Sequence, residues 1–116
     1  MHVRRVLRAT LPSAMHLVQL LLPLYDNRGR RLDAGLFAQV RDELVERFGG
    51  LTAYTRAPAS GVWEETGGDT VHDDIVIYEV MVDTLDDAWW RAFRARTEQR
   101  FGQDELVVRA HAIVRF

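Results

Sequence analysis

Two stretches of this chain, residues 21–50 and 74–103, repeat one pattern at an offset of 53 positions. Seven of the thirty aligned positions are identical, and several further pairs keep their apolar character. The identical pairs are Tyr25/Tyr78, Leu32/Leu85, Asp33/Asp86, Arg41/Arg94, Arg47/Arg100, Phe48/Phe101 and Gly49/Gly102. Internal repetition of this kind means that one supersecondary unit occurs twice. The repeat therefore predicts two related halves, each a strand followed by a helix.

The stretches between and after the repeats complete the order of elements. We expect strands at residues 16–25, 51–57, 75–82 and 105–116, and helices at about residues 34–48 and 87–101. Capping residues support the helices: Asp33 and Thr84 or Asp86 would begin them, and Gly49 and Gly102 would end them. Pro58 would end the second strand, and a long glycine-containing hairpin loop would follow it.

This order, strand-helix-strand-strand-helix-strand, is the split βαβ or ferredoxin-like plan. It predicts an α+β fold with a four-stranded antiparallel sheet and two helices on one face. The first and third strands would be central, and the second and fourth would form the edges. We expect residues 1–13 to be a basic N-terminal arm and residues 14–116 to be a single domain.

The predicted central strands are apolar on both faces, although two helices can cover only one face of such a sheet. One set of alternating residues is Val18, Leu20, Leu22, Leu24, Val76, Val80 and Val82, and the other is Leu17, Leu21, Ile75, Ile77 and Met81. An exposed apolar patch predicts an association site. We therefore expect a homodimer formed through the open sheet face or edge. Folding of the N-terminal arm over that face is the alternative.

The composition excludes several kinds of chemistry. The chain has no cysteine, so disulfides, thiolate nucleophiles and sulfur-ligated metals are excluded, and it has no lysine, so Schiff-base chemistry is excluded too. A formal net charge of −2 argues against nucleic-acid binding. The apolar run 14–24 is interrupted by polar residues and is too short to cross a bilayer. We expect a cytoplasmic protein with no membrane partner, no cofactor and no metal.

Polar and aromatic side chains are mixed with the apolar residues of the predicted strands, where they could line a small pocket on the open face. Tyrosine and arginine there would suit a planar or anionic small molecule. The ligand-binding candidates are Gln19, Tyr25, Arg56, Arg109 and the loop residue Trp63. The alternative is that they form the rim of a dimer interface, where tyrosine and arginine are enriched.

Catalytic candidates are few: His111, His72, Tyr78 and Tyr54. His72 stands beside two aspartates, and paired carboxylates near a histidine can do acid–base chemistry if they are partly buried; the alternative is a solvated hairpin. His16 and His111 would face each other across antiparallel strands, but no third metal ligand is fixed by spacing. Arg91, Arg94, Arg96 and Arg100 crowd one helix and could bind phosphate, unless Glu98 and the acidic hairpin pair with them.

Several local motifs together resemble small bacterial proteins described only as domains of unknown function. The motifs are Leu24-Tyr25-Asp26-Asn27-Arg28-Gly29, Glu46-Arg47-Phe48-Gly49-Gly50-Leu51-Thr52, Gly61-Val62-Trp63-Glu64 and Asp73-Asp74-Ile75-Val76-Ile77. The resemblance covers residues 17–114 and implies a ferredoxin-like domain of uncharacterised role, with no catalytic residues to transfer.

The plan is also similar to that of dimeric α/β-barrel proteins, which include cofactor-independent oxygenases and isomerases as well as heme-binding proteins. The sequence contains no P-loop, zinc ribbon or nucleophile elbow. The favoured reading is a non-enzymatic homodimeric domain that binds a small ligand at the sheet face or dimer interface. The alternative is a small cofactor-independent enzyme of the α/β-barrel type.

Overall fold

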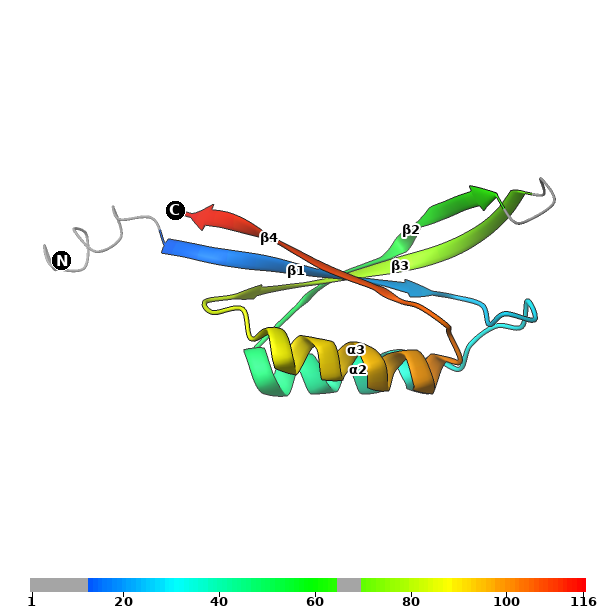
Figure 1. The fold of residues 1–116 in the computed structure, drawn as a ribbon, viewed down its shortest axis with the longest axis horizontal. Coiled ribbons are helices and arrows are strands. Elements are labelled where there is room, and N and C mark those ends of the chain that lie inside the picture. The colour runs from blue at the N-terminus through cyan, green and yellow to red at the C-terminus, as the bar shows by residue number, and fades with distance from the viewer. Residues whose placement is uncertain (1–12, 65–69) are drawn as a thin grey trace, which may run out of the picture.

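The structure, a computed structural model, describes residues 13–64 and 70–116, with the backbone alone for residues 13, 56–64 and 70–73. Across these residues six elements follow one another in the predicted order (Figure 1). They are β1 (Ser13–Pro23), α2 (Ala34–Phe48), β2 (Thr52–Glu64), β3 (Thr70–Val82), α3 (Asp87–Phe101) and β4 (Val107–Arg115). Most of the predicted N-terminal arm lies outside the described residues.

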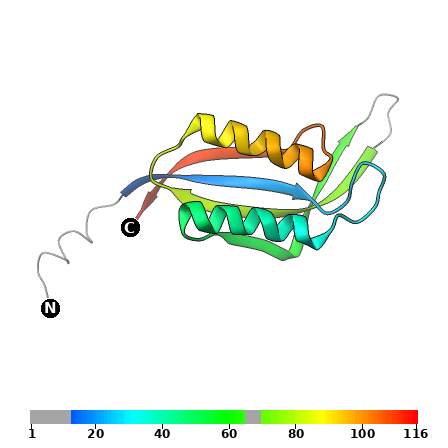
Figure 2. The same ribbon diagram turned by 90° about the horizontal axis from the view of Figure 1, so that it is seen from below.

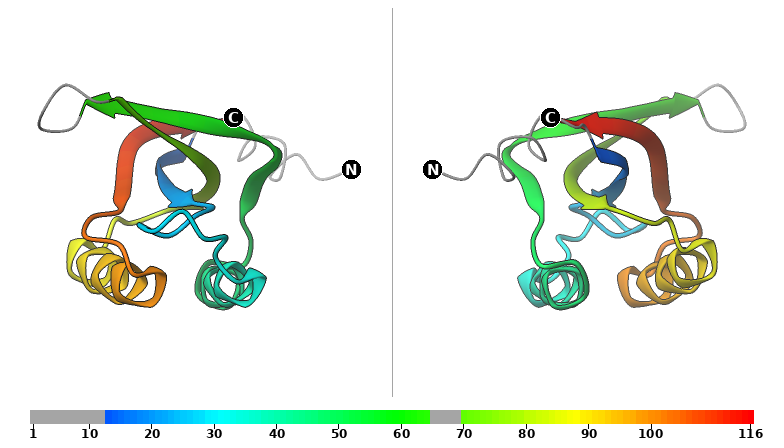
Figure 3. Two further views of the ribbon diagram at one scale, coloured as in Figure 1. Left: turned by 90° about the vertical axis from the view of Figure 1, so that its right-hand side faces the viewer. Right: turned by 90° about the vertical axis from the view of Figure 1, so that its left-hand side faces the viewer.

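The strands form one antiparallel sheet in the order β2-β3-β1-β4, so the two repeat-related strands are central, as predicted. The helices lie side by side against one face (Figure 2), and a view along the molecule shows both beneath the sheet (Figure 3). No helix of the described residues covers the other face. This confirms the predicted α+β, ferredoxin-like arrangement.

The helix ends confirm the capping predictions in part. Asp86 is the N-cap of α3, and its carboxylate accepts a hydrogen bond from the Trp89 N–H at 3.1 Å. Asp33 is the N-cap of α2 but makes no side-chain cap hydrogen bond. Gly49 and Gly102 end the helices with φ of 84° and 61°, a left-handed conformation that glycine adopts without a steric penalty.

In the hairpin between β2 and β3, the strands are longer and the loop is shorter than predicted. β2 continues past Pro58 to Glu64 and pairs with β3 from Thr70, after a register shift between Tyr54 and Ala59. β2 is an edge strand, and a proline is tolerated at an irregularity of an edge strand because no ladder hydrogen bond is lost there. The expectation that Pro58 ends the strand and opens a long loop is therefore wrong.

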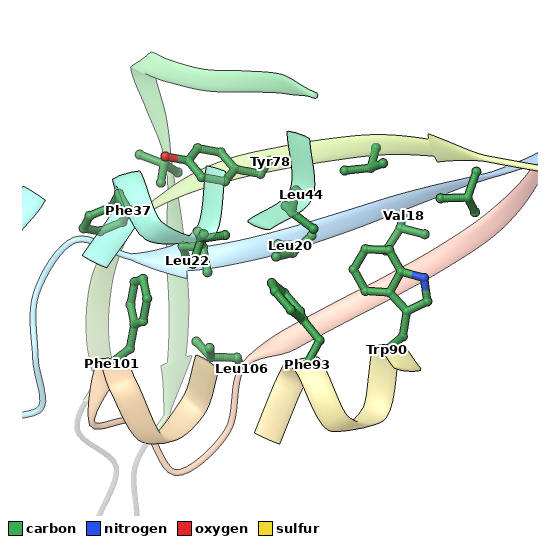
Figure 4. Close-up of a cluster of buried hydrophobic side chains, with 14 residues drawn as sticks. Val18, Leu20, Leu22, Phe37, Leu44, Tyr78, Trp90, Phe93, Phe101 and Leu106 are labelled. Atoms are coloured by element: carbon green, nitrogen blue, oxygen red, sulfur yellow. The ribbon is translucent and has the colours of Figure 1, made fainter. Parts of the chain in front are cut away.

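The core lies between the helices and the sheet face that carries Val18, Leu20 and Leu22 (Figure 4). These residues alternate along β1, and Val76, Tyr78, Val80 and Val82, which alternate along β3, join them. The fully buried members contributed by the helices are Val40, Leu44, Phe93, Phe101 and Thr97. The Thr97 hydroxyl donates to the Phe93 carbonyl oxygen at 2.7 Å, so this buried polar group is satisfied.

Aromatic residues at the helix ends pack the two halves against each other. Phe37 meets Phe101 edge-on with ring centroids 5.2 Å apart, and Phe48 stacks on Trp90, also at 5.2 Å. Phe37 corresponds to Trp90 in the sequence repeat, and Phe48 corresponds to Phe101. The repeat therefore appears in the structure as two equivalent contacts, each joining the start of one helix to the end of the other.

Candidate functional site

The open face of the sheet combines apolar surface with charge. Along β1 and β3 it presents the residues that alternate with the core set, and several of them remain accessible. Met81 is 47% exposed and Val107 is 46% exposed, whereas Leu17, Leu21 and Ile77 are half-buried. A sheet face that met only water would be expected to carry polar side chains at these positions.

Four polar side chains cross this face in a line, one from each strand, and hydrogen bonds join the first three. We call Arg109, Gln19, Glu79 and Tyr54, from β4, β1, β3 and β2, the polar row. In the sheet register Gln19 lies opposite both Arg109 and Glu79. Arg109 Nε donates to Gln19 Oε1 at 2.9 Å, and Gln19 Nε2 donates to Glu79 Oε2 at 2.6 Å. The amide of Gln19 thus links a cation to an anion.

Tyr54 completes the polar row through the same carboxylate. The hydrogen bond to Glu79, and then the negative charge of Glu79, raise the pKa of the Tyr54 phenol above its ordinary value of 10.0. The neutral phenol is the form that donates to a carboxylate, so this hydrogen bond disfavours its ionisation. Tyr54 is half exposed, and its hydroxyl therefore remains accessible to a ligand.

A cavity of about 550 Å³ adjoins the polar row at the end of the sheet where β1 and β2 begin. Its walls come from the open face and from residues 48–52, which connect α2 to β2. The open-face residues that line it include Met15, Leu17, Glu79 and Met81, with Asp83 and Arg115 at its margin. This volume lies within the range of small-molecule sites, roughly 300–1,000 Å³.

The predicted site residues, ligand-binding and catalytic together, divide into those on the open face, those elsewhere in the described chain and those whose side chains are not described. Gln19 and Arg109 are brought together in the polar row, beside Tyr54 from the catalytic candidates. His111 also lies on the open face, opposite Leu17, and is exposed. The side chains of Arg56, Trp63 and His72 lie outside the described residues.

Tyr25 lies beyond the four-stranded sheet. It follows the end of β1 in a turn closed by a β-bridge to Arg31, whose guanidinium lies 5.8 Å from the ring centroid. The Asp26 carboxylate holds this turn by accepting from the Arg28 and Arg30 N–H groups, each at 2.9 Å. The Arg30 and Arg28 N–H groups lower the pKa of Asp26, partly offset by desolvation.

Tyr78 belongs to the core rather than to a site. It is 1% exposed on the helix side of β3, and its hydroxyl accepts a hydrogen bond from Arg41 Nη1 at 3.1 Å. The hydroxyl of a buried tyrosine needs such a partner. Tyr78, one of the catalytic candidates, therefore lies on the opposite face of the sheet from the candidates His111 and Tyr54.

His16 and His111 do not face each other. His16 lies opposite Ala112 and His111 lies opposite Leu17, so the two histidines point to opposite faces of the sheet. Within residues 13–64 and 70–116, no group of three metal-ligating side chains lies close enough to hold an ion. The possible histidine pair is therefore excluded by the register.

Glu79 is the member of the polar row that sequence reasoning missed. It is the one charged residue between Ile75 and Val82, a stretch that is otherwise apolar apart from Tyr78. A lone carboxylate in a central strand is costly to desolvate and needs partners. This single charge in an apolar stretch was the available signal. Glu79 has the same alternation as Ile77 and Met81, which would have placed it on the open face.

Fold and site together define an α+β domain of the ferredoxin-like plan with an open sheet face that carries a polar row and a cavity. No protein-family model and no curated protein matches the chain. Among solved structures, a phage SAM lyase in complex with S-methyl-5'-thioadenosine has a TM-score of 0.58 at 13% sequence identity, over 90% of this chain and 91% of that chain. At this identity the similarity establishes a shared fold. Neither helix in the described part of the chain is long and apolar enough to span a membrane.

Proposed function

We propose that this chain acts as a homodimeric binding domain, in which the open sheet faces of two copies pack together and enclose a small molecule beside the polar row. The observation that carries the proposal is the polar row itself, which is hydrogen-bonded across β4, β1 and β3 and continued by Tyr54 of β2 within an apolar face. Apolar residues there favour a partner. A partly buried carboxylate in the same face favours recognition of a polar ligand.

The charges of the polar row make the open face complementary to itself. Arg109 is its positive end on edge strand β4, and Glu79 is its negative end towards the other edge. A two-fold axis parallel to the strands would bring the β4 side of one copy over the β2 side of the other. Arg109 of each copy would then approach Glu79 of the second copy, as an isologous interface requires. This charge pattern favours a second copy as the occupant of the face.

The cavity beside the polar row indicates the class of ligand. It combines the apolar side chains of Met15, Leu17 and Met81 with the carboxylates of Glu79 and Asp83. Ionised carboxylates only accept hydrogen bonds, so the ligand must donate to them. We expect a molecule of nucleoside size with an apolar or aromatic body and one or more donor groups.

The oligomeric state tests the dimer. Light scattering on a size-exclusion column should give the mass of two copies for the wild type and of one copy for Met81→Arg, because an arginine there places charge inside the apolar contact. Val45→Arg is the matched control: Val45 is 46% exposed on the helix α2, away from the open face, and Met81 is 47% exposed. A wild type that stays monomeric at high micromolar concentration contradicts the proposal, and so does an equal effect of both variants.

Native mass spectrometry tests the ligand. Protein purified under mild conditions should carry a small molecule whose mass disappears after denaturation. Glu79→Gln should retain less of it, compared at a concentration at which this variant is still dimeric. If wild-type protein takes up no small molecule from a nucleoside and metabolite mixture, the ligand part of the proposal is wrong even where the dimer is observed.

A cofactor-independent enzyme is the second candidate, and the Tyr54–Glu79 pair favours it. A phenol hydrogen-bonded to a carboxylate at the mouth of a cavity can hold or transfer a proton. The neighbour of known structure gives the first substrate to try. We would incubate the protein with SAM and look for S-methyl-5'-thioadenosine by mass spectrometry. Formation of this product by wild type but not by Glu79→Gln would support the enzyme, and no product at micromolar enzyme would contradict this substrate.

A further inference from the structure

A second cavity, of about 260 Å³, lies between α3 and β4 on the helix side of the sheet. Its residues include Val18 and Val108, which point towards the helices, whereas the polar row lies on the opposite face. The sheet therefore separates this cavity from the site proposed above. Its remaining lining residues are Leu85, Asp87, Trp90, Arg91, Arg94, Arg109 and Ala110.

Two arginines of α3 give this cavity its charge. Arg91 and Arg94 are three residues apart, so they are neighbours on one side of the helix. Arg94 Nε is buried and has no hydrogen-bond partner among the described groups. The Arg94 side chain as a whole is 44% exposed, so the rest of the guanidinium remains accessible.

The carboxylate nearest to Arg94 does not satisfy it. Arg94 Nε lies 3.8 Å from Glu98 Oε2, beyond hydrogen-bonding distance, and that oxygen already accepts the Leu106 N–H at 2.9 Å. A buried donor without a partner is destabilising, and a guanidinium binds a carboxylate best in a two-point contact. Because Nε itself is buried, an anion in the cavity would contact the accessible remainder of the Arg94 guanidinium.

The opposing charges around the cavity leave it positive. Asp87, four residues before Arg91, contributes one negative charge to the wall. Arg109 uses its guanidinium on the other face, where it donates to Gln19, so we do not count it. Among the lining side chains, Arg91 and Arg94 outnumber the single carboxylate of Asp87, while Glu98, which pairs with Arg94 at 3.8 Å, does not line the cavity. This balance in the wall favours an anion over a cation.

The apolar part of the wall limits what the anion carries. Leu85 and Trp90 line the cavity with the two valines, and Figure 4 shows the Trp90 indole beside Val18. The volume equals that of about nine water molecules in the liquid and is smaller than that of a drug-sized site. A small acid with a compact apolar or aromatic body would fit, its body against Trp90 and its carboxylate at the arginines.

We infer that the cavity between α3 and β4 is a binding site for a small organic carboxylate, with Arg94 and Arg91 as the anion-binding residues and Trp90 as the apolar wall. This site is independent of the open face and of the dimer. The sequence marks this helix as well, because four arginines lie within residues 91–100.

Benzoate is the probe that tests the site, with benzyl alcohol as a neutral control of the same shape. The three indole N–H signals of ¹⁵N-labelled protein would be followed by NMR at low ionic strength and assigned with Trp89→Phe and Trp63→Phe. Benzoate should shift the Trp90 signal with saturation, and benzyl alcohol should shift it little. A response to both probes alike, or none up to millimolar benzoate, overturns the proposal.

Matched charge-removing variants separate this site from general attraction of anions. Arg94→Gln should weaken benzoate binding at least about tenfold, equal to about 1.4 kcal/mol, and Arg91→Gln should weaken it as well. Arg96→Gln removes the same charge from the same helix, but Arg96 lies outside the cavity, over the Phe93 ring. Equal loss with Arg96→Gln would mean that only net charge matters, and the site would be disproved.

Ala110→Glu provides a test that does not remove a residue of the helix. Ala110 is exposed on edge strand β4 and lines the cavity, so a longer acidic side chain there can pair with the arginines without disturbing the core. This variant should fold as the wild type does by circular dichroism and should lose benzoate binding. Full binding by folded Ala110→Glu would contradict the assignment.

Discussion

The proposed site depends on the carboxylate of Glu79. It accepts from Gln19 on one neighbouring strand and from Tyr54 on the other, so three strands meet at one pair of oxygens. Hydrogen bonds to an ionised group are roughly twice as strong as neutral ones. Removing this charge should therefore affect both neighbours, and Tyr54 reports that effect directly.

The ionisation of Tyr54 gives the first prediction. Its pKa is raised above 10.0 in the folded chain, because Glu79 holds the proton on the phenol. The resulting stabilisation is fully present below pH 10.0 and is lost as the pH rises through the folded pKa. Glu79→Gln should bring the Tyr54 pKa back towards 10.0, measured by phenolate absorbance during a pH titration. Tyr54→Phe identifies the signal, and an unchanged pKa in Glu79→Gln would contradict the hydrogen bond.

The second prediction concerns Phe93, which is completely buried beneath the sheet. Phe93→Ala removes a large apolar side chain and leaves a cavity, and it should lower the free energy of unfolding by about 3–5 kcal/mol. Phe116→Ala is the control, because Phe116 is 97% exposed and its loss should change stability by less than about 0.5 kcal/mol. Urea denaturation of both variants measures the difference, and equal midpoints would contradict the packing.

Prediction of single residues from the sequence fails where a shift of one position in the strand register decides which face of the sheet a side chain lies on. The sequence correctly makes β1 and β4 neighbours, yet the register sets His16 opposite Ala112, one residue away from His111. A shift of one residue moves a side chain to the other face of a sheet. The role of Tyr78 also depends on its face: it lies on the same face of β3 as Val76 and Val80 and is therefore among the buried residues.

At the scale of elements, the ends of the helices follow from single residues. The repeat places aspartate at the same position before both helices, but only Asp86 uses its side chain as a cap. The hydrogen bond to Trp89 satisfies one of the backbone N–H groups that the first turn leaves free. The two helices thus allow a comparison between an N-cap aspartate that makes a side-chain hydrogen bond and one that does not.

The third prediction uses that comparison. Asp86→Ala should lower the free energy of unfolding by about 1 kcal/mol, because it removes a side-chain cap. Asp33→Ala should cost less, since Asp33 makes no side-chain cap hydrogen bond. Thermal and urea denaturation of the two variants, measured in parallel, give the difference. A cost for Asp33→Ala that equals or exceeds that of Asp86→Ala would show that the two caps are equivalent.

Strand lengths are the part of the fold that the sequence predicts least well. The helix boundaries have local signals, namely capping aspartates and left-handed glycines, and both were predicted closely. The β2–β3 hairpin has a proline within β2, and only its position in an edge strand, at a register shift, makes that proline acceptable. The edge position of β2 follows from the predicted plan, but the register shift depends on how β2 pairs with β3, and no local pattern reveals it.

The whole molecule has two unequal sides. On the helix side the repeat produces two equivalent aromatic contacts and a filled core. On the open side the symmetry breaks, because Gln19, Glu79 and Arg109 have different charges and come from different strands. The internal repeat therefore explains the fold, whereas the proposed function depends on residues that the two halves do not share in role: Gln19 and Arg109 lie outside the repeat, and Glu79 is aligned with Asp26, which holds a turn.

The last prediction tests how two copies meet. With the two-fold axis along the strands, Arg109→Glu places an acidic residue opposite Glu79 at both contacts of the dimer. Glu79→Arg likewise places a basic residue opposite Arg109 at both contacts. Each single variant should weaken dimerisation at least about tenfold, or about 1.4 kcal/mol. The double variant Arg109→Glu/Glu79→Arg restores opposite charges at both contacts and should dimerise nearly as well as the wild type. With the axis across the strands, residue 109 would meet its own copy, so Arg109→Glu would leave repulsion between like charges unchanged. Sedimentation equilibrium gives the dissociation constants, and an unchanged constant for Arg109→Glu would exclude the proposed orientation.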